Sequence, residues 1–319
     1  MQKRPLGNSG LAVSPLALGA NVFGWTVPTP QASFPILDAF VDLGFDLIDT
    51  ADMYSTWVSG NQGGESETII GQWFAANPGK RGKVVLATKV GMPMGHGGKG
   101  LSKDYILRAV EDSLRRLQTD YIDLYQSHKD DPDTPLAETL EAYQTLIEQG
   151  KVRHIGASNY TAQRLGEALE TGRLNRLPEY ISLQPEYNLY DRAGFEAELE
   201  PLCLKHGIGV IPYFALAAGF LTGKYRSEAD LHKSARGGGV GKKYLNPRGL
   251  RILDALDAVA PAHGVNPGVI ALAWLMARSS ITAPIASATS VAQLQEIAKA
   301  ADIALTPEQV LLLDTASAY

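Results

Sequence analysis

Eight short apolar segments alternate with longer helical patterns along this chain, and this alternation constrains the fold more than any other feature. None of the eight shows the polar alternation of a half-exposed strand, so they are typical of parallel strands that are covered on both faces. The expected strands span residues 16–20, 45–49, 84–88, 122–126, 153–157, 180–184, 209–213 and 282–286.

Helical patterns separate these segments. After Ser102, a plausible N-cap, Ile106, Val110 and Leu114 fall on one stripe of a helix. Residues 306–309 combine a capping box with a proline at the first helical position, which predicts an extra C-terminal helix. Residues 3–14 carry an Asn-Ser-Gly turn and are expected to form a small hairpin at the bottom of the sheet.

Eight strands with helices between them are accommodated most simply by a (β/α)8 TIM barrel, and an open doubly wound sheet is the alternative. The 319 residues, 45% of them hydrophobic, show no linker or internal repeat, so we expect a single domain over 1–319. Three glycine-rich polar segments, 55–65, 90–101 and 224–247, are expected to be long loops. In a barrel each would follow a strand and lie on the catalytic face.

Composition narrows the functional classes. The net charge is −5 and basic residues are scattered, which argues against a nucleic-acid partner. The one cysteine, Cys203, excludes an internal disulfide, fits a reducing compartment and lies in an apolar helical stretch typical of a buried thiol. The N-terminus lacks the apolar region of a signal peptide, and no stretch approaches the ~20 apolar residues of a membrane span. We therefore expect a cytoplasmic protein with no membrane partner.

Four polar residues gather the candidate chemistry. Asp49, Lys89 and His128 stand at the ends of successive expected strands, and Tyr54 follows five residues after the first. An acid, a phenol, an amine and an imidazole at one end of a barrel can shift the pKa of a tyrosine and transfer a proton to a carbonyl. A purely structural pair of Lys89 with Asp49 is the alternative.

Other motifs indicate no further chemistry. A literal G-x-G-x-x-G occurs at residues 95–100, but it does not follow a strand directly, so a flexible loop is the better interpretation. None of the six histidines pairs with a second histidine at metal-ligand spacing, and no metal site is expected.

The same segments resemble the aldo-keto reductases over nearly the whole chain. The matching blocks are residues 44–54 (GFDLIDTADMY), 67–71, 87–89, 120–128, 150–159, 183–188 and 219–225. This resemblance implies a (β/α)8 barrel that uses NAD(P)H, without metal or flavin, to reduce a small-molecule carbonyl substrate.

The resemblance also implies roles for the four residues. Tyr54 would be the general acid that protonates the carbonyl oxygen, and His128 would orient the substrate carbonyl. Lys89, paired with Asp49, would lower the pKa of Tyr54, as an ammonium does beside a phenol whose ordinary pKa is about 10.

By the same resemblance, a further set of residues would bind the cofactor. Ser158, Asn159 and Gln184 would contact the nicotinamide carboxamide, Tyr213 would lie under the ring, and backbone around Leu216, Gly219, Leu221 and Lys224 would meet the pyrophosphate. The turn containing Ser287, Thr289, Ser290 and Gln293 would receive the adenosine end, where a helix N-terminus suits a phosphate, although an ordinary helix cap explains Ser290 equally well. NADP(H) is favoured over NAD(H), with Arg278 or a residue of the 225–245 segment supplying positive charge.

Two tryptophans, Trp25 and Trp57, are plausible walls of a substrate pocket, and packed surface aromatics are the alternative. Two other functions stay open. One is a cofactor-binding regulatory subunit built on the same barrel, of the kind that the potassium-channel β-subunits represent. The other is a Schiff-base aldolase with Lys89 as nucleophile. The sequence does not indicate an oligomeric state.

Overall fold

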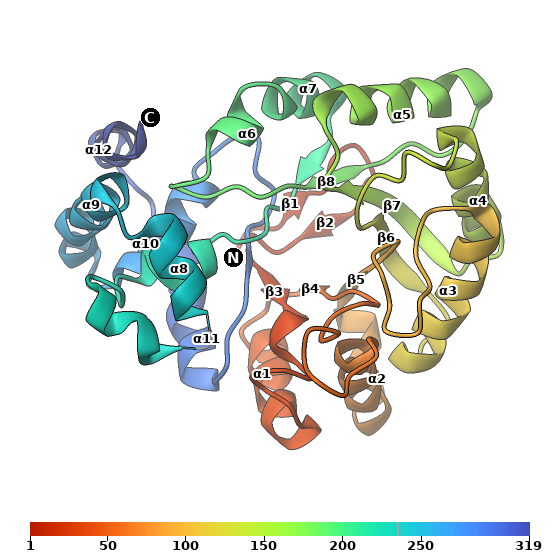
Figure 1. The fold of residues 1–319 in the computed structure, drawn as a ribbon, viewed down its shortest axis with the longest axis horizontal. Helices are drawn as coiled ribbons and strands as arrows, with labels where there is room; N and C mark the ends of the chain where they lie inside the picture. Colours follow the sequence, from red (N-terminus) through yellow and green to blue (C-terminus); the bar gives the residue numbers. More distant parts are fainter. Residues whose placement is uncertain (235) are drawn as a thin grey trace.

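The main sheet contains one parallel strand for each predicted apolar segment (Figure 1). The computed structural model describes residues 1–234 and 236–319. The strands are β3 (Ala17–Gly19), β4 (Leu47–Asp49), β5 (Val85–Val90), β6 (Ile122–Ser127), β7 (Val152–Ser158), β8 (Ser182–Gln184), β9 (Gly209–Val210) and β10 (Ile285–Ala286). Their order is β10-β3-β4-β5-β6-β7-β8-β9, so neighbours in sequence are neighbours in space.

Hydrogen bonds between β9 and the segment leading into β10 close this sheet. Val210 forms a parallel bridge with Ile281, and its carbonyl accepts a bond of 2.8 Å from the Thr282 N–H. The Ile285 N–H donates to the Pro212 carbonyl over 2.9 Å. The predicted barrel is therefore confirmed, and the open doubly wound alternative is wrong.

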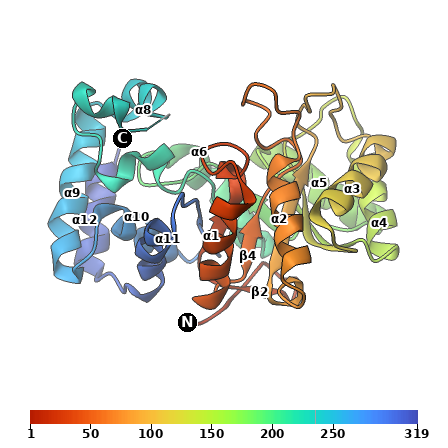
Figure 2. The same ribbon diagram turned by 90° about the horizontal axis from the view of Figure 1, so that it is seen from below.

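Helices cover the outside of the strands (Figures 1 and 2). The α-helices are α1 (Pro30–Asp42), α2 (Glu65–Ala76), α3 (Lys103–Leu117), α4 (Leu136–Glu148), α5 (Ala162–Asn175), α6 (Ala193–Glu196), α7 (Leu199–His206), α8 (Gly237–Tyr244), α9 (Pro247–His263), α10 (Pro267–Met276), α11 (Val291–Ala298) and α12 (Pro307–Ser317). Short 3-10 helices are η1 (Ala20–Val22), η2 (Arg81–Lys83), η3 (Ala217–Thr222), η4 (Glu228–Lys233) and η5 (Lys299–Asp302).

Local sequence signals explain where two of these helices begin. In α3 the predicted stripe of Ile106, Val110 and Leu114 is buried, and Ser102 holds the N-cap position, although its hydroxyl makes no capping bond. At α12, the predicted extra C-terminal helix, Thr306 and Gln309 form the expected reciprocal capping box.

The N-terminal hairpin is also confirmed. β1 (Arg4–Pro5) pairs antiparallel with β2 (Ala12–Val13), and Leu6 and Val13 join the apolar side chains inside the barrel. A Cβ on Gly7 would lie 2.3 Å from the Ile181 carbonyl oxygen, so the hairpin approaches the barrel too closely for a larger residue. The hairpin thus closes the end of the barrel at which the strands begin.

The prediction of a long loop over 224–247 is wrong, because much of this segment is helical. Val240 and Tyr244, four residues apart on α8, are buried. Gly237 lies so close to Leu231 that a Cβ there would be 1.7 Å from the leucine carbonyl oxygen. Gly237 therefore permits close packing between η4 and α8. Glycine content alone predicts flexibility and does not reveal this contact.

Two further sequence expectations concern helices. Cys203 lies buried in α7, as predicted. No single helix in the described part of the chain is long and apolar enough to cross a bilayer. The pair α9 and α10, bent by 91° at their junction, passes that test only when both are counted together.

Candidate active site

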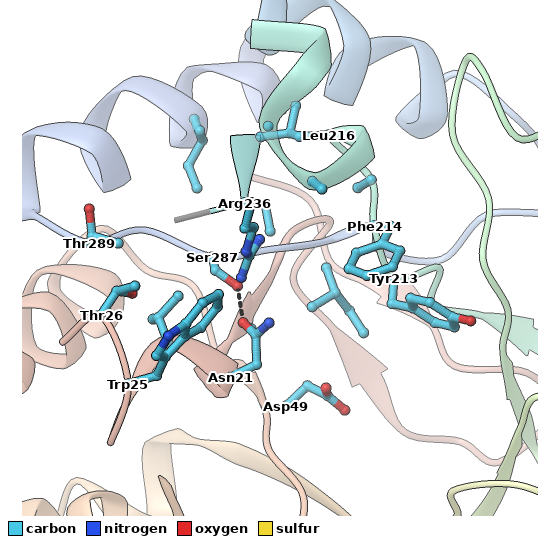
Figure 3. A pocket seen from close by; sticks show the side chains of 18 of the residues that line it. Asn21, Trp25, Thr26, Asp49, Tyr213, Phe214, Leu216, Arg236, Ser287 and Thr289 are labelled. Carbon is cyan, nitrogen blue, oxygen red and sulfur yellow. Dashed lines mark hydrogen bonds between the residues drawn. The ribbon is translucent and has the colours of Figure 1, made fainter. Parts of the chain in front are cut away.

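A cavity of about 1240 Å³ opens at the carboxyl ends of the barrel strands. Figure 3 shows side chains from distant parts of the chain converging on it, among them Asn21 and Trp25 after β3, Tyr213 after β9, and Ser287 after β10. Parallel strands present their carboxyl ends at one edge of a barrel, which is why residues so far apart in sequence meet here.

The four predicted chemical residues lie together at this cavity. The Lys89 ammonium, fully buried, donates to Asp49 Oδ2 at 2.7 Å, to the Thr50 carbonyl at 2.9 Å and to Tyr54 Oη at 2.7 Å. The ring centroids of Tyr54 and His128 are 5.9 Å apart. Asp49, Tyr54 and His128 all line the cavity.

A second layer of amides holds Asp49 from the side opposite Lys89. Asp49 Oδ1 accepts hydrogen bonds from Gln126 Nε2 at 3.1 Å and from Gln184 Nε2 at 2.9 Å. Gln184 also donates to Gln126 Oε1 at 3.1 Å. Because both oxygens of this buried carboxylate are satisfied, its orientation toward Lys89 is fixed.

Burial shifts the pKa values of the tyrosine and the lysine. Burial, and secondarily the charge of Asp49, raise the pKa of Tyr54 well above its usual value. Burial lowers the pKa of Lys89, although Asp49 opposes this. The expectation that Lys89 lowers the pKa of Tyr54 stays a prediction, because the net upward shift has burial and the nearby Asp49 carboxylate as its main causes and does not isolate the effect of the ammonium.

His128 is held as a neutral imidazole. Its side chain is buried, and its backbone N–H donates to the Val90 carbonyl at 2.8 Å. Burial, and then the nearby Lys89 ammonium, lower the pKa of His128 well below its usual value. Nδ1 has no hydrogen-bond partner among the described residues. A neutral ring beside Tyr54 can donate a hydrogen bond without carrying charge.

The residues expected at a nicotinamide carboxamide form a connected polar wall. Ser158 Oγ donates to the Gln184 carbonyl at 2.9 Å, and Asn159 Nδ2 donates to the His128 carbonyl at 2.9 Å. Tyr213 Oη donates to Asn159 Oδ1 at 2.7 Å. Asn159 has a φ of 55°, a left-handed backbone that asparagine tolerates better than most residues. Hydrogen bonds through Asn159 thus connect Tyr213 to the backbone of His128.

The segment from Phe214 to Lys224 forms an irregular rim of the cavity. Phe214, Ala217 and Ala218 all have φ values near 50°, which for residues other than glycine indicates a backbone held by its surroundings. Leu216, Gly219 and Lys224 line the cavity as expected, whereas Leu221 is buried outside the lining and its N–H bonds to the Leu216 carbonyl at 3.2 Å.

The turn before α11 forms another part of the cavity wall. Ser287, Thr289 and Gln293 line the cavity, and Ser287 Oγ donates to Asn21 Oδ1 at 2.6 Å (Figure 3). Ser290 is not among the lining residues. Its hydroxyl accepts from the Gln293 N–H at 3.2 Å, so it serves as the ordinary N-cap of α11.

Aromatic side chains wall the opening near Tyr54. Trp25 and Trp57 both line the cavity with ring centroids 5.8 Å apart, and Trp57 lies 6.0 Å from the Tyr54 ring. The Arg236 guanidinium stacks over Trp25 at 5.0 Å. Figure 3 shows Arg236 reaching down between Trp25 and the rim that carries Leu216.

Sequence reasoning missed several of these residues, and some had a detectable signal. Gln126 lies on β6 two positions before His128, which directly follows that strand, so the strand period of two directs both side chains to the same side. Asn21 follows the end of β3, much as His128 follows the end of β6. The 225–245 segment was expected to supply a positive charge and Arg236 lies in it, but the sequence does not single out this residue because its position depends on how the 224–247 segment folds.

The part of the chain that the structure describes contains no group of three or more His, Cys, Asp or Glu placed to hold a metal ion.

Comparisons with known proteins agree on one family. The family model described as "Aldo/keto reductase family" matches residues 15–318. The chain is 37% identical to the uncharacterized oxidoreductase YrpG of Bacillus subtilis, over 98% of this chain and 95% of that protein. It is 35% identical to a probable voltage-gated potassium channel subunit beta of Arabidopsis thaliana, over 96% and 94% respectively. It is 32% identical to protein tas of Escherichia coli, over 92% and 91%.

Proposed function

The chain belongs to the aldo/keto reductase family of oxidoreductases, and from that premise we propose that it reduces aldehydes or ketones to alcohols with NAD(P)H. The observation that carries this proposal is the contact of Lys89 Nζ with both Tyr54 Oη and Asp49 Oδ2 at 2.7 Å. It presents a protonated phenol to a cavity large enough for a dinucleotide and a small substrate.

In this proposal, each of the four polar residues has a separate role in the reduction. Tyr54 donates its proton to the carbonyl oxygen, and the neutral imidazole of His128 donates a hydrogen bond that orients the same oxygen. Lys89 and Asp49 hold the phenol in place. A reduced nicotinamide bound in the cavity would supply the hydride to the carbonyl carbon and would itself be oxidised.

The cavity lining fits a nicotinamide dinucleotide. The polar wall of Ser158, Asn159 and Gln184 offers amide and hydroxyl groups to a carboxamide, and Tyr213 offers an aromatic surface to the ring. Two other lining residues, Lys224 and Arg236, carry cationic groups that suit phosphates. Arg236 stacks on Trp25.

The same cations favour NADP(H) over NAD(H). Lys224, Lys233 and Arg236 all come from the 224–247 segment and line the cavity that also contains Thr289 and Gln293. Arg278, the other source of charge considered from the sequence, contacts Asp314 and is not a lining residue. We therefore assign the 2′-phosphate to the 224–247 segment.

The direct test is loss of reduced-cofactor absorbance with benzaldehyde, comparing NADPH and NADH, in wild type and Tyr54→Phe. The proposal expects turnover that is faster with NADPH and that Tyr54→Phe nearly removes, while cofactor binding persists. Equal turnover in wild type and Tyr54→Phe would contradict the assignment of the acid. Equal rates with the two cofactors would contradict the phosphate assignment alone.

A second candidate is a cofactor-binding regulatory subunit, because one relative carries the name of a potassium channel β-subunit. This function requires binding of NADPH but no turnover, so cofactor binding without reduction of any of a panel of aldehydes would favour it. The aldolase alternative is weaker. Lys89 is fully buried and donates to three acceptors, and a Schiff base would break those bonds.

The remaining expectations are also proposals. Residues 1–319 are proposed to form one domain acting on a small carbonyl compound. A cytoplasmic location is proposed because Cys203 is a lone buried thiol, whose pKa burial raises to about 12.

A further inference from the structure

Lys129 gives the catalytic cavity a cation that the reduction chemistry does not use. It follows His128 directly, lines the same cavity as Tyr54, and its side chain is exposed. No ion pair or side-chain hydrogen bond of Lys129 occurs among the described residues, in contrast to Lys89, Lys103 and Lys243.

The acids nearest in sequence are engaged elsewhere. Asp130 receives both Nε and Nη2 of Arg164, at 2.9 and 3.0 Å. Asp131 accepts from the Leu101 N–H at 2.7 Å and from Thr134 Oγ1 at 2.8 Å. Asp130 and Asp131 are therefore held by other partners, and neither forms an ion pair with Lys129.

The start of this side chain is fixed relative to the reacting groups. Asn159 Nδ2 holds the His128 carbonyl at 2.9 Å, and the His128 N–H is held by Val90. The Cα atoms of consecutive residues lie about 3.8 Å apart. Lys129 therefore begins next to His128 and lines the same cavity, within reach of a substrate whose carbonyl meets His128.

The neighbouring residues of the cavity wall indicate what the rest of the substrate is like. Trp57, Phe214, Met53 and Met92 line the cavity, and the first two are 46% and 43% exposed. Large apolar side chains that remain this exposed in a cavity offer surface to a flat apolar ligand. The other cationic lining groups near solvent, Lys224, Lys233 and Arg236, come from the segment assigned above to the cofactor.

We propose that Lys129 selects carbonyl substrates that carry an anionic group on an aromatic or similarly apolar frame. This inference rests on the proposed reductase function and names its preferred substrate class. Lys129 would act on binding, through attraction to a carboxylate at the mouth of the cavity, and would take no part in proton transfer.

The test compares 4-carboxybenzaldehyde with its methyl ester, which has the same carbonyl and ring but no charge. The ratio of kcat/KM for the acid to that for the ester is measured with NADPH in wild type, Lys129→Met and Lys129→Arg. An exposed ion pair typically contributes up to about fivefold, so Lys129→Met should lower the ratio about threefold to fivefold. Lys129→Arg should retain it, and 0.5 M NaCl should reduce it in wild type.

Lys99→Met is the matched control. Lys99 is also exposed and lies near Asp131, but it does not line the cavity, so its removal changes the net charge equally without changing the site. Lys99→Met should keep the wild-type ratio. An unchanged ratio in Lys129→Met, or an equal loss in Lys99→Met, would overturn the inference while leaving the reductase function intact.

A binding measurement separates the two proposals if no aldehyde is reduced. The corresponding alcohols, 4-(hydroxymethyl)benzoate and its methyl ester, are titrated while tryptophan fluorescence is followed, because Trp25 and Trp57 line the cavity. Tighter binding of the acid in wild type but not in Lys129→Met would support the anion preference even though turnover failed. Equal affinities for acid and ester in wild type would overturn it.

Discussion

The Lys89 ammonium donates to the Tyr54 hydroxyl oxygen over 2.7 Å, and this contact directs the tyrosine proton away from the lysine. An oxygen that accepts a hydrogen bond from an ammonium keeps its own hydrogen for another acceptor. The other acceptor recorded for that hydrogen is Asp49 Oδ2 at 3.5 Å, which is the outer limit of a hydrogen bond. A carbonyl oxygen in the cavity would therefore be a better acceptor for the Tyr54 proton.

Replacement of Tyr54 by phenylalanine should remove the proton donor and little else. We expect kcat with benzaldehyde to fall by about 10²–10⁴-fold, the usual contribution of a positioned general acid. The dissociation constant for NADPH, measured by fluorescence titration, should change by less than about threefold, because Tyr54 is not assigned to the cofactor. A parallel loss of cofactor affinity would mean that the ring supports the dinucleotide site instead.

The Lys89–Asp49 pair should show strong energetic coupling because both side chains are buried. Their side chains are 0% and 2% exposed, so Lys89→Met leaves a buried carboxylate without its cation. Loss of one partner of a buried pair typically costs about 3–5 kcal/mol. Lys89→Met combined with Asp49→Asn should be less destabilised than the sum of the single variants, as measured by urea unfolding.

A surface pair supplies the comparison for that cycle. Lys103 and Glu141 approach to 3.4 Å with side chains 40% and 51% exposed. Lys103→Met should change the free energy of unfolding by no more than about 1 kcal/mol. Additive effects at Lys89 and Asp49, or an equal effect at Lys103, would contradict the assignment of a desolvated pair.

Much of the barrel could be predicted from sequence because buried parallel strands are continuous apolar runs. Each expected strand has a counterpart in the sheet, and the four chemical residues converge because strand ends meet at one edge. Lys89 was informative in particular, since a lysine that ends an apolar strand needs a partner.

The remaining features depend on contacts between distant residues. Ser287 meets Asn21 across 266 positions, and Gly237 fits against Leu231 only because α8 forms. The net shift of the Tyr54 pKa depends on its surroundings in a similar way. The proximity of Lys89 could be inferred from the sequence, whereas complete burial of the phenol beside Asp49 could not.

His128 should make the protein less stable in mild acid. Its folded pKa lies well below the ordinary value of about 6.5, because burial and Lys89 disfavour the cation. Above about pH 6.5 the imidazole is neutral in both states, and its contribution to stability is fully present. Below that pH the unfolded chain binds a proton that the folded chain does not. The free energy of unfolding then falls, by up to about 1.4 kcal/mol per pH unit, until the folded pKa is reached.

Urea unfolding at pH 7.5 and pH 5.0 checks this linkage. His128→Asn should lose less stability than wild type between the two pH values. His206→Asn, at an exposed position on α7, should behave as wild type does. The same pH dependence in His128→Asn and wild type would mean that another group governs the acid response.

Gly71 should be required by the packing of α2 against α3. A Cβ at this position would lie 2.0 Å from the Arg116 carbonyl oxygen, well inside any real contact, and the obstacle is backbone rather than a movable side chain. Gly71→Ala should therefore destabilise the protein by about 1–3 kcal/mol, the range for overpacking, despite the better helix propensity of alanine. Gly166 on α5 is the matched control, because nothing lies within 4 Å of its added Cβ. Gly166→Ala should stabilise by about 0.5–1 kcal/mol through reduced backbone entropy. If Gly71→Ala raised the urea midpoint as Gly166→Ala does, helix propensity rather than the α2–α3 contact would govern position 71.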